Sequence, residues 1–260
     1  MQENREEKLK SFGRLLNIMD DLRTQCPWDK KQTMESLRHL TIEEVYELAD
    51  AILNNNMEEI KKELGDILLH IVFYSRIGSE TNSFDIKSVI DGVCEKIIHR
   101  HPHIYGDVKV KDDAEVSRNW EKLKLKEGKK SVLEGVPVSL PALVKAMRIQ
   151  EKARAAGFDW ERKEQVWEKV MEEMNELKKE LHETNHERAK AEFGDVLFAL
   201  VNYARFLGID PEESLERTNK KFIKRFQYME SAVNSNGQKF NDMSLDEMDV
   251  YWNEAKEKGM

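Results

Sequence analysis

Apolar residues recur along most of this 260-residue chain at the three- and four-residue spacing of one face of an α-helix. The spacing is clearest at residues 12–19, 45–52, 60–71 and 166–181, and a further apolar stretch covers residues 193–207. Two short polar runs, residues 54–56 and 183–187, separate successive apolar stretches and predict turns. The pattern therefore predicts an all-α protein built from helical hairpins.

Capping and helix-breaking residues predict where several helices begin or end. Thr41 lies three residues before Glu44, as in a capping box, and predicts a helix start at Thr41. Asp210 followed by Pro211 fits an N-cap with proline in the first helical position. The histidine-rich run 99–106 could bind a transition metal, but Pro102 marks a helix end there, so we interpret the run as a structural turn.

The chain repeats itself on either side of a region rich in glycine and proline, between Gly128 and Pro141. This region interrupts the helical pattern and is the expected boundary between two tandem helical-bundle modules. We expect a first module at residues 1–127, a linker at 128–139 and a second module at 140–260.

The clearest repeated feature is a pattern of four carboxylates, written twice at an offset of 129 residues. Acids three positions apart on a helix share one face, so each copy directs two pairs of acids from two successive helices. Converging carboxylates repel one another unless a cation lies among them, and oxygen ligands favour Mg²⁺, with Mn²⁺ as an alternative. The sequence therefore predicts two metal sites, formed by Glu44, Glu47, Glu63 and Asp66, and by Glu173, Glu176, Glu192 and Asp195.

The aspartate of each copy lies in one of the most apolar stretches of the chain. We expect Asp66 and Asp195 to face inward, where an unpaired charge costs several kcal/mol. Gly65 and Gly194 precede them, and glycine inside a helix costs about 0.5–1 kcal/mol relative to alanine. We therefore expect close helix packing beside each site.

Other metals fit the pattern less well. A di-iron carboxylate bundle requires Glu-x-x-His on two helices. His70 follows Asp66 by four residues, but its counterpart in the second copy is Ala199. Zinc is disfavoured because the acids repeat without cysteine or a repeated histidine.

Cations and aromatic residues repeat with the acids. A Lys-x-x-x-Arg pair can grip phosphate, and a tryptophan can stack on a base or cover a ribose. Together with a metal, these groups are what a nucleoside polyphosphate requires. The repeated sets are Lys96, Arg100, Trp120 and Lys124 in the first copy and Lys221, Arg225, Trp252 and Lys256 in the second.

Composition limits the possible partners and location. The formal net charge of −8 makes a nucleic-acid polymer a poor partner. Cys26 and Cys94 form no zinc or CxxC pattern and are expected to be reduced thiols. The charged N-terminus does not fit a signal peptide, and no apolar run has the length of a membrane span, so we expect a cytoplasmic protein without a membrane partner.

Several segments, in order along nearly the whole chain, resemble the two-module MazG-type nucleoside triphosphate pyrophosphohydrolases of the all-α pyrophosphohydrolase group. The matching segments are LRTQCPWDKKQT, IEEVYEL, ELGDILLHIVFY, HRHPHIYGD, SLPAL, AGFDW, EEMNEL, FGDVLFALVNYARFLG and NKKFIKRF. The resemblance implies Mg²⁺-dependent hydrolysis of an NTP or dNTP to its monophosphate and pyrophosphate, with broad base tolerance. It also implies a homodimer and a house-cleaning role, or control of nucleotide alarmones.

The resemblance also implies roles for single residues, chiefly in the second module. Metal ligands correspond to Glu173, Glu176, Glu192 and Asp195, and we expect Glu172 or Glu173 to orient the attacking water. Lys169 has the neutral counterpart Leu40, so we rank the second site above the first. The alternative is a nucleotide-binding regulatory or dimerisation module with little turnover. The implied substrate contacts are Lys169, Lys221, Arg225, Trp252 and Lys256.

Overall fold

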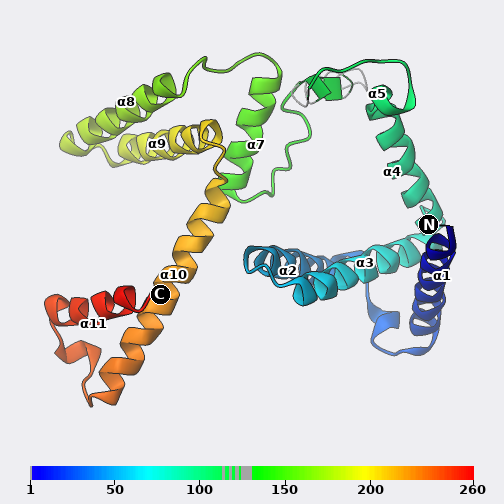
Figure 1. Ribbon diagram of the computed structural model, residues 1–260, viewed down its shortest axis with the longest axis horizontal. Coiled ribbons are helices and arrows are strands. Elements are labelled where there is room, and N and C mark those ends of the chain that lie inside the picture. The colour runs from blue at the N-terminus through cyan, green and yellow to red at the C-terminus, as the bar shows by residue number, and fades with distance from the viewer. Residues whose placement is uncertain (1, 113–114, 117–118, 121–122, 124–130) are drawn as a thin grey trace. The chain divides into compact units, whose positions relative to one another are not determined.

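The computed structural model describes residues 2–112, 115–116, 119–120, 123 and 131–260. All the regular structure in these residues is helical, which confirms the predicted all-α class (Figure 1). The chain divides into two compact units, Met1–Val110 and Lys111–Met260. The expected linker, residues 128–139, therefore falls inside the second unit, and its first three residues lie outside the described part.

The first unit is built around an antiparallel helical hairpin, against which the N-terminal helix packs. Its core consists of Met19 from the N-terminal helix, Leu37, and the neighbouring Val72 and Phe73, all at most 3% exposed. Met19 belongs to the predicted apolar spacing, but Leu37, Val72 and Phe73 lie outside the predicted stretches. On α3 the predicted positions Leu64, Leu68 and Ile71 are 53%, 39% and 42% exposed, so the core uses a different face of that helix. In chain order the elements are α1 (Gln2–Gln25), η1 (Asp29–Lys31), α2 (Met34–Leu53), α3 (Met57–Glu80), α4 (Ile86–Arg100) and α5 (Pro102–Tyr105).

The start of α2 differs from the prediction. Thr33 is its N-cap, accepting from the Ser36 amide, while the Ser36 hydroxyl accepts from the Thr33 amide. Thr41 lies in the middle of the helix, so the predicted start at Thr41 is wrong. Its hydroxyl donates to the Leu37 carbonyl at 3.0 Å and lies 2.7 Å from Nδ1 of His70.

The second unit contains a matching hairpin, with α7 packed against its second helix (Figure 1). The turns of both hairpins place a residue at positive φ, Asn55 or Thr184, directly before an asparagine N-cap, which confirms the two predicted turns. The elements are α7 (Ala142–Ala155), α8 (Lys163–His182), α9 (His186–Phe206), α10 (Pro211–Ser235), η2 (Phe240–Asp242) and α11 (Leu245–Glu257).

Helix α10 extends away from this hairpin, and α11 packs against its distal part (Figure 1). Met229, Val233 and Ala255 are buried where these two helices meet. Asp210 caps α10 by accepting from the Glu213 amide, with Pro211 in the first turn, as predicted.

Other predictions concern turns, glycines and thiols. Helix α4 ends at Arg100 and α5 begins at Pro102, which confirms the helix end there. A methyl group added at Gly65 or Gly194 would meet no heavy atom within 4 Å, so the predicted close packing at these glycines is wrong. Cys26 and Cys94 are free thiols. Among the described residues, no helix combines the length and apolar character that crossing a membrane requires.

Candidate functional site

The α8–α9 hairpin brings three of the predicted acids together. One carboxylate oxygen from each of Glu173, Glu176 and Glu192 lies within 4.8 Å of the others. Glu173 is buried, whereas Glu176 is exposed. The pKa of Glu192 is raised, first by its partial burial and then by repulsion from Glu176 and other carboxylates. The acids therefore form a concentrated negative charge that a cation would relieve.

Lys169 is one helical turn before this cluster, on α8. Its Nζ atom donates to Oε1 of Glu172 at 2.8 Å and lies 2.8 Å from Oε1 of Glu173. Hydrogen bonds to these carboxylates raise the pKa of Lys169, so the ammonium stays charged. Glu172 is exposed and turned toward Lys169, outside the three-acid group.

Asp195 departs from the prediction. It is exposed rather than buried, and Asp66 is only half-buried, so the expectation that both aspartates face the core is wrong. Asp195 instead lines an open cavity beside Glu173, which provides solvent for its charge. It still adds to the repulsion that raises the pKa of Glu192.

Glu180 is a carboxylate that sequence reasoning missed. It is 8% exposed, and its Oε2 atom has no hydrogen-bond partner among the described residues. Its other oxygen lies 3.9 Å from Nη1 of Arg188. Glu180 also raises the pKa of Glu192. The sequence does contain a signal for Glu180. It follows Glu173 by seven residues and Glu176 by four, so the three acids share one helix face.

The first unit forms a similar cluster on α2 and α3. Carboxylate oxygens of Glu44, Glu63 and Asp66 lie within 4.8 Å of one another, whereas Glu47 is exposed and outside this group. Burial, followed by repulsion from Asp66 and Glu47, raises the pKa of Glu44. Glu63 is 2% exposed, and its Oε2 atom has no hydrogen-bond partner in the described structure.

Both clusters suit a divalent cation. Each presents several oxygens over a short distance, and each includes a buried carboxylate, Glu63 or Glu173. In the first cluster the exposed Lys62 donates to Oε1 of Glu63 at 2.9 Å. In the described structure it does not reach the Oε2 atom of the same carboxylate. Hard cations such as Mg²⁺ take ligands of this kind. The four acids of each predicted set thus lie on the expected helices, with three of them closely grouped.

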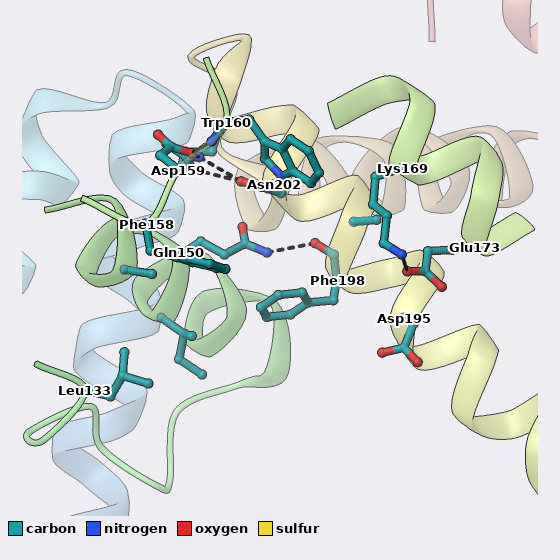
Figure 2. Close-up of a pocket in the computed structure, with 14 residues that line it drawn as sticks. Leu133, Gln150, Phe158, Asp159, Trp160, Lys169, Glu173, Asp195, Phe198 and Asn202 are labelled. Atoms are coloured by element: carbon teal, nitrogen blue, oxygen red, sulfur yellow. Dashed lines mark hydrogen bonds and ion pairs between the residues drawn. The ribbon is translucent and has the colours of Figure 1, made fainter. Parts of the chain in front are cut away.

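A cavity of about 580 Å³ opens beside the second cluster (Figure 2). Glu173 and Asp195 line one part of it, and Lys169 lies next to Glu173. The remaining wall comes from α7, the segment before α8, and α9. Its volume is within the range of about 300–1,000 Å³ that small-molecule sites occupy.

Core side chains occupy the corresponding positions of the first unit. There Leu40, Leu69, His70 and Phe73 replace Lys169, Phe198, Ala199 and Asn202 at the same offset of 129 residues. Phe73 is a core residue at 3% exposure, and Leu40 and Leu69 pack against that core. His70 is buried and contacts Thr41, so the two hairpins differ in whether these positions line a cavity.

The predicted substrate-binding cations of the second module form a separate cluster on α10 and α11. The guanidinium carbon of Arg225 lies 5.6 Å from the ring centre of Trp252, and Arg225 donates through Nε to the Met260 carbonyl at 2.8 Å. Lys221 and Lys256 are exposed on the same two helices. None of these four side chains lines the described cavity, so one chain does not bring them to the acids.

The corresponding residues of the first copy fall in both units. Lys96 and Arg100 lie on α4, which packs against α3 and α5. Trp120 belongs to the second unit, and Lys124 lies outside the described residues.

Sequence reasoning also missed polar residues in the cavity wall. Arg205 donates through Nη1 to Oδ2 of Asp159 at 3.0 Å and through Nε to Oδ1 of Asn202 at 3.0 Å. Gln150 is buried in the same wall. Asn202 has the core residue Phe73 as its counterpart, so a search for repeated chemistry could not identify it.

Comparison with known proteins identifies the same repeat. The MazG nucleotide pyrophosphohydrolase domain matches residues 32–105 and again residues 161–229. The chain is 42% identical, over 94% of its length and 95% of the relative, to "Nucleoside triphosphate pyrophosphohydrolase/pyrophosphatase MazG" of Thermotoga maritima. It is 37% identical, over 95% and 98% of the two chains, to "Nucleoside triphosphate pyrophosphohydrolase" of Escherichia coli. It is 49% identical to "Uncharacterized protein YabN" of Bacillus subtilis, and there it spans about half of the relative, 53%.

Proposed function

The chain belongs to the MazG nucleotide pyrophosphohydrolase family, and from this membership we propose that it hydrolyses nucleoside triphosphates between the α- and β-phosphates. The products are a nucleoside monophosphate and pyrophosphate. The observation that carries the proposal is the cavity that opens directly beside Glu173 and Asp195. In this proposal the enzyme removes unwanted NTPs and dNTPs in the cytoplasm and accepts many different bases.

The cofactor in this proposal is Mg²⁺, with Mn²⁺ as an alternative. The grouped carboxylates of Glu173, Glu176 and Glu192 would hold it, with Asp195 beside them. When bound there, such a cation would supply positive charge to the phosphate oxygens and would lower the pKa of a bound water. Support comes from the raised pKa of Glu192 and from the burial of Glu173, because both indicate negative charge in need of a cation.

The protein side chains orient the reactants. Glu172 or Glu173 accepts a proton from the attacking water, whose oxygen forms a bond to the α-phosphorus. The bond from that phosphorus to the bridging oxygen breaks, and pyrophosphate leaves with the bonding electron pair. Lys169, already beside Glu172 and Glu173, offsets the charge of the phosphates.

We propose a homodimer in which a second copy supplies Lys221, Arg225, Trp252 and Lys256 to the phosphates and the nucleoside. Within one chain these side chains lie on α10 and α11 and are absent from the described cavity lining. The outer faces of α9 and α10 also expose large apolar side chains that a partner helix could cover, among them Phe193, Phe222 and Ile223.

The second unit is the proposed site of turnover. The first unit has a comparable acid cluster, but core side chains fill the positions that line the cavity in the second. We assign Glu44, Glu63 and Asp66, with Glu47, to cation binding. The first unit is also where the alternative function fits, namely nucleotide or metal binding with little turnover. Lys96, Arg100, Trp120 and Lys124 remain weaker proposals, since the first two belong to the first unit, Trp120 belongs to the second, and Lys124 lies outside the described residues.

Pyrophosphate release from a panel of NTPs with and without Mg²⁺ tests the function. Glu173→Ala and Asp195→Ala should each abolish release, whereas Glu44→Ala and Asp66→Ala should retain most of it. Unchanged release in both second-unit variants would overturn the site assignment. NTP binding without any release by the unaltered chain would favour the regulatory alternative.

A further inference from the structure

Gln150 is a buried amide with one unused hydrogen-bonding atom. Its side chain is 5% exposed, and Nε2 donates to the Phe198 carbonyl at 2.8 Å. A carbonyl can only accept, so this bond determines which end of the amide is the nitrogen. The Oε1 atom has no donor in the described structure. Figure 2 shows it directed away from Phe198, toward the side of the cavity on which Asn202 and Trp160 are drawn.

The orientation of Asn202 is also determined by its neighbours. Its Oδ1 atom accepts from Nε and Nη2 of Arg205 at 3.0 and 2.8 Å. Asp159 holds the same guanidinium from its other side. Two donors on Oδ1 leave the Asn202 amide nitrogen to donate elsewhere, and Asn202 lines the cavity. The cavity therefore contains one preset acceptor and one preset donor.

Aromatic rings surround these two amides. Phe158, Trp160 and Phe198 line the cavity and are 85%, 44% and 43% exposed. Rings of this kind stack on the face of a base, and because every base has such a face, the stacking accepts any base. The same cavity is lined by Glu173 and Asp195, so a base among the rings leaves its phosphates beside the acids.

We infer that this cavity is the nucleobase subsite of the second unit, in which Gln150 accepts a hydrogen bond from the base and Asn202 donates one. This inference rests on the proposed function for its substrate. Adenine, guanine, cytosine and uracil all present an N–H donor next to an acceptor on their pairing edge. One acceptor and one donor thus suit every common base and select against a base edge that lacks N–H groups.

The test compares ATP with purine riboside triphosphate, whose base has acceptors but no N–H group on its edge. The unaltered chain should favour ATP by about tenfold in kcat/KM, as expected from one hydrogen bond to a buried acceptor. Gln150→Met should reduce this ratio to about one. Asn202→Asp, which keeps an acceptor for Arg205 but removes the donor, should weaken use of both nucleotides.

Inhibition by inorganic tripolyphosphate, which has no base, is the control. Its inhibition constant should be the same in the unaltered chain and in both variants. Equal use of the two nucleotides by the unaltered chain would overturn the inference, as would weaker tripolyphosphate inhibition in Gln150→Met. If no NTP is hydrolysed, the proposed function fails, and calorimetric binding of α,β-methylene ATP against its purine riboside analogue decides the base subsite separately.

Discussion

The Nζ atom of Lys169 lies 2.8 Å from Oε1 of Glu173, the buried acid of the second cluster. At the same offset in the first unit, Leu40 precedes Glu44 and packs against the hydrophobic core instead. The buried acid of each cluster thus has a lysine beside it, but Lys169 lies one turn before Glu173 on α8, whereas the exposed Lys62 is the direct neighbour of Glu63 on α3. This difference, together with the open cavity, distinguishes two hairpins that carry the same four acids.

The variant Lys169→Met tests the role of this ammonium. We expect kcat/KM for ATP to fall by about 10- to 100-fold, equivalent to roughly 1.4–2.8 kcal/mol of lost transition-state stabilisation. Mg²⁺ binding to the free protein should be retained or tightened, because Oε1 of Glu173 loses a competing cation. Steady-state kinetics and calorimetric titration with Mg²⁺ provide the two measurements.

Lys178→Met is the matched control, since Lys178 is exposed on the same helix. It should leave both quantities within about twofold, as expected for a surface charge. Weakened Mg²⁺ binding in Lys169→Met would show that Lys169 supports the cation site rather than the phosphates.

The variant Glu63→Gln tests whether the first cluster is held together by a cation. The Oε2 atom of Glu63 is buried without a donor, and Glu44 and Asp66 lie within 4.8 Å. With EDTA present, we expect the amide to raise the free energy of unfolding by about 1–3 kcal/mol, because it removes a buried charge that lies beside Glu44 and Asp66 and is paired only through Oε1, with the exposed Lys62. If the cluster binds Mg²⁺, the unaltered chain should be stabilised by the ion and the variant should lose that stabilisation.

Thermal unfolding with EDTA and with Mg²⁺ measures both effects. Glu58→Gln, on the same helix but with an 86% exposed side chain, should change neither. A destabilised Glu63→Gln in EDTA would contradict the interpretation that repulsion within the cluster outweighs the pairing of Glu63 with Lys62.

The helical hairpins could be predicted because their information is local. Apolar spacing from Leu64 to Ile71 and the asparagine before each second helix are properties of neighbouring residues. The acid clusters could be predicted because the acids repeat. Local sequence was misleading at Thr41. The capping box that begins this helix is formed earlier in the chain, by Thr33 and Ser36.

The base subsite could not be predicted, because it depends on three-dimensional contacts between distant segments. Gln150 and Phe198 are 48 residues apart, and Asp159 and Arg205 are 46 apart. The expected burial of Asp195 is wrong because the residues around it are apolar, as in a core helix, although this part of the helix lines a cavity that is open to solvent. The repeat in the sequence also predicts that Trp252 lies near the acids. In the structure Trp252 belongs to α11, which packs on α10 instead.

Glu80→Gln should change the pH dependence of stability. Oε1 and Oε2 of Glu80 accept from Nε and Nη2 of Arg23 at 2.8 and 2.9 Å, and the hydrogen bonds to Arg23 lower the pKa of Glu80. A lowered pKa in the folded state means that this stabilisation is present above the unfolded pKa, near 4.3, and is lost as pH falls through the folded value. The variant should therefore be less stable at pH 7 by up to about 1 kcal/mol and equal to the unaltered chain at pH 2–3.

Urea unfolding at several pH values measures the difference. Glu6→Gln removes an acid from a highly exposed pair with Lys10 on α1 and should show little difference at any pH. A Glu80→Gln deficit that persisted unchanged at low pH would point to lost packing instead of the charge.

Gly194→Ala relates stability to assembly. A Cβ atom at Gly194 meets no heavy atom within 4 Å in the single chain, and the residue lies inside α9. Alanine should therefore stabilise this helix by about 0.5–1 kcal/mol, as glycine loses more backbone entropy on folding. Urea unfolding of Gly194→Ala, with Gly65→Ala for the first unit, measures the gain.

The proposed homodimer gives Gly194→Ala a second readout. If a partner helix approaches Gly194 closely, the added methyl group would weaken association and lower stability at low protein concentration. Sedimentation of both variants over a range of concentrations separates the cases. Stabilisation with unchanged assembly would place the dimer contact elsewhere, whereas a variant that dissociates would explain why glycine occupies this helix position.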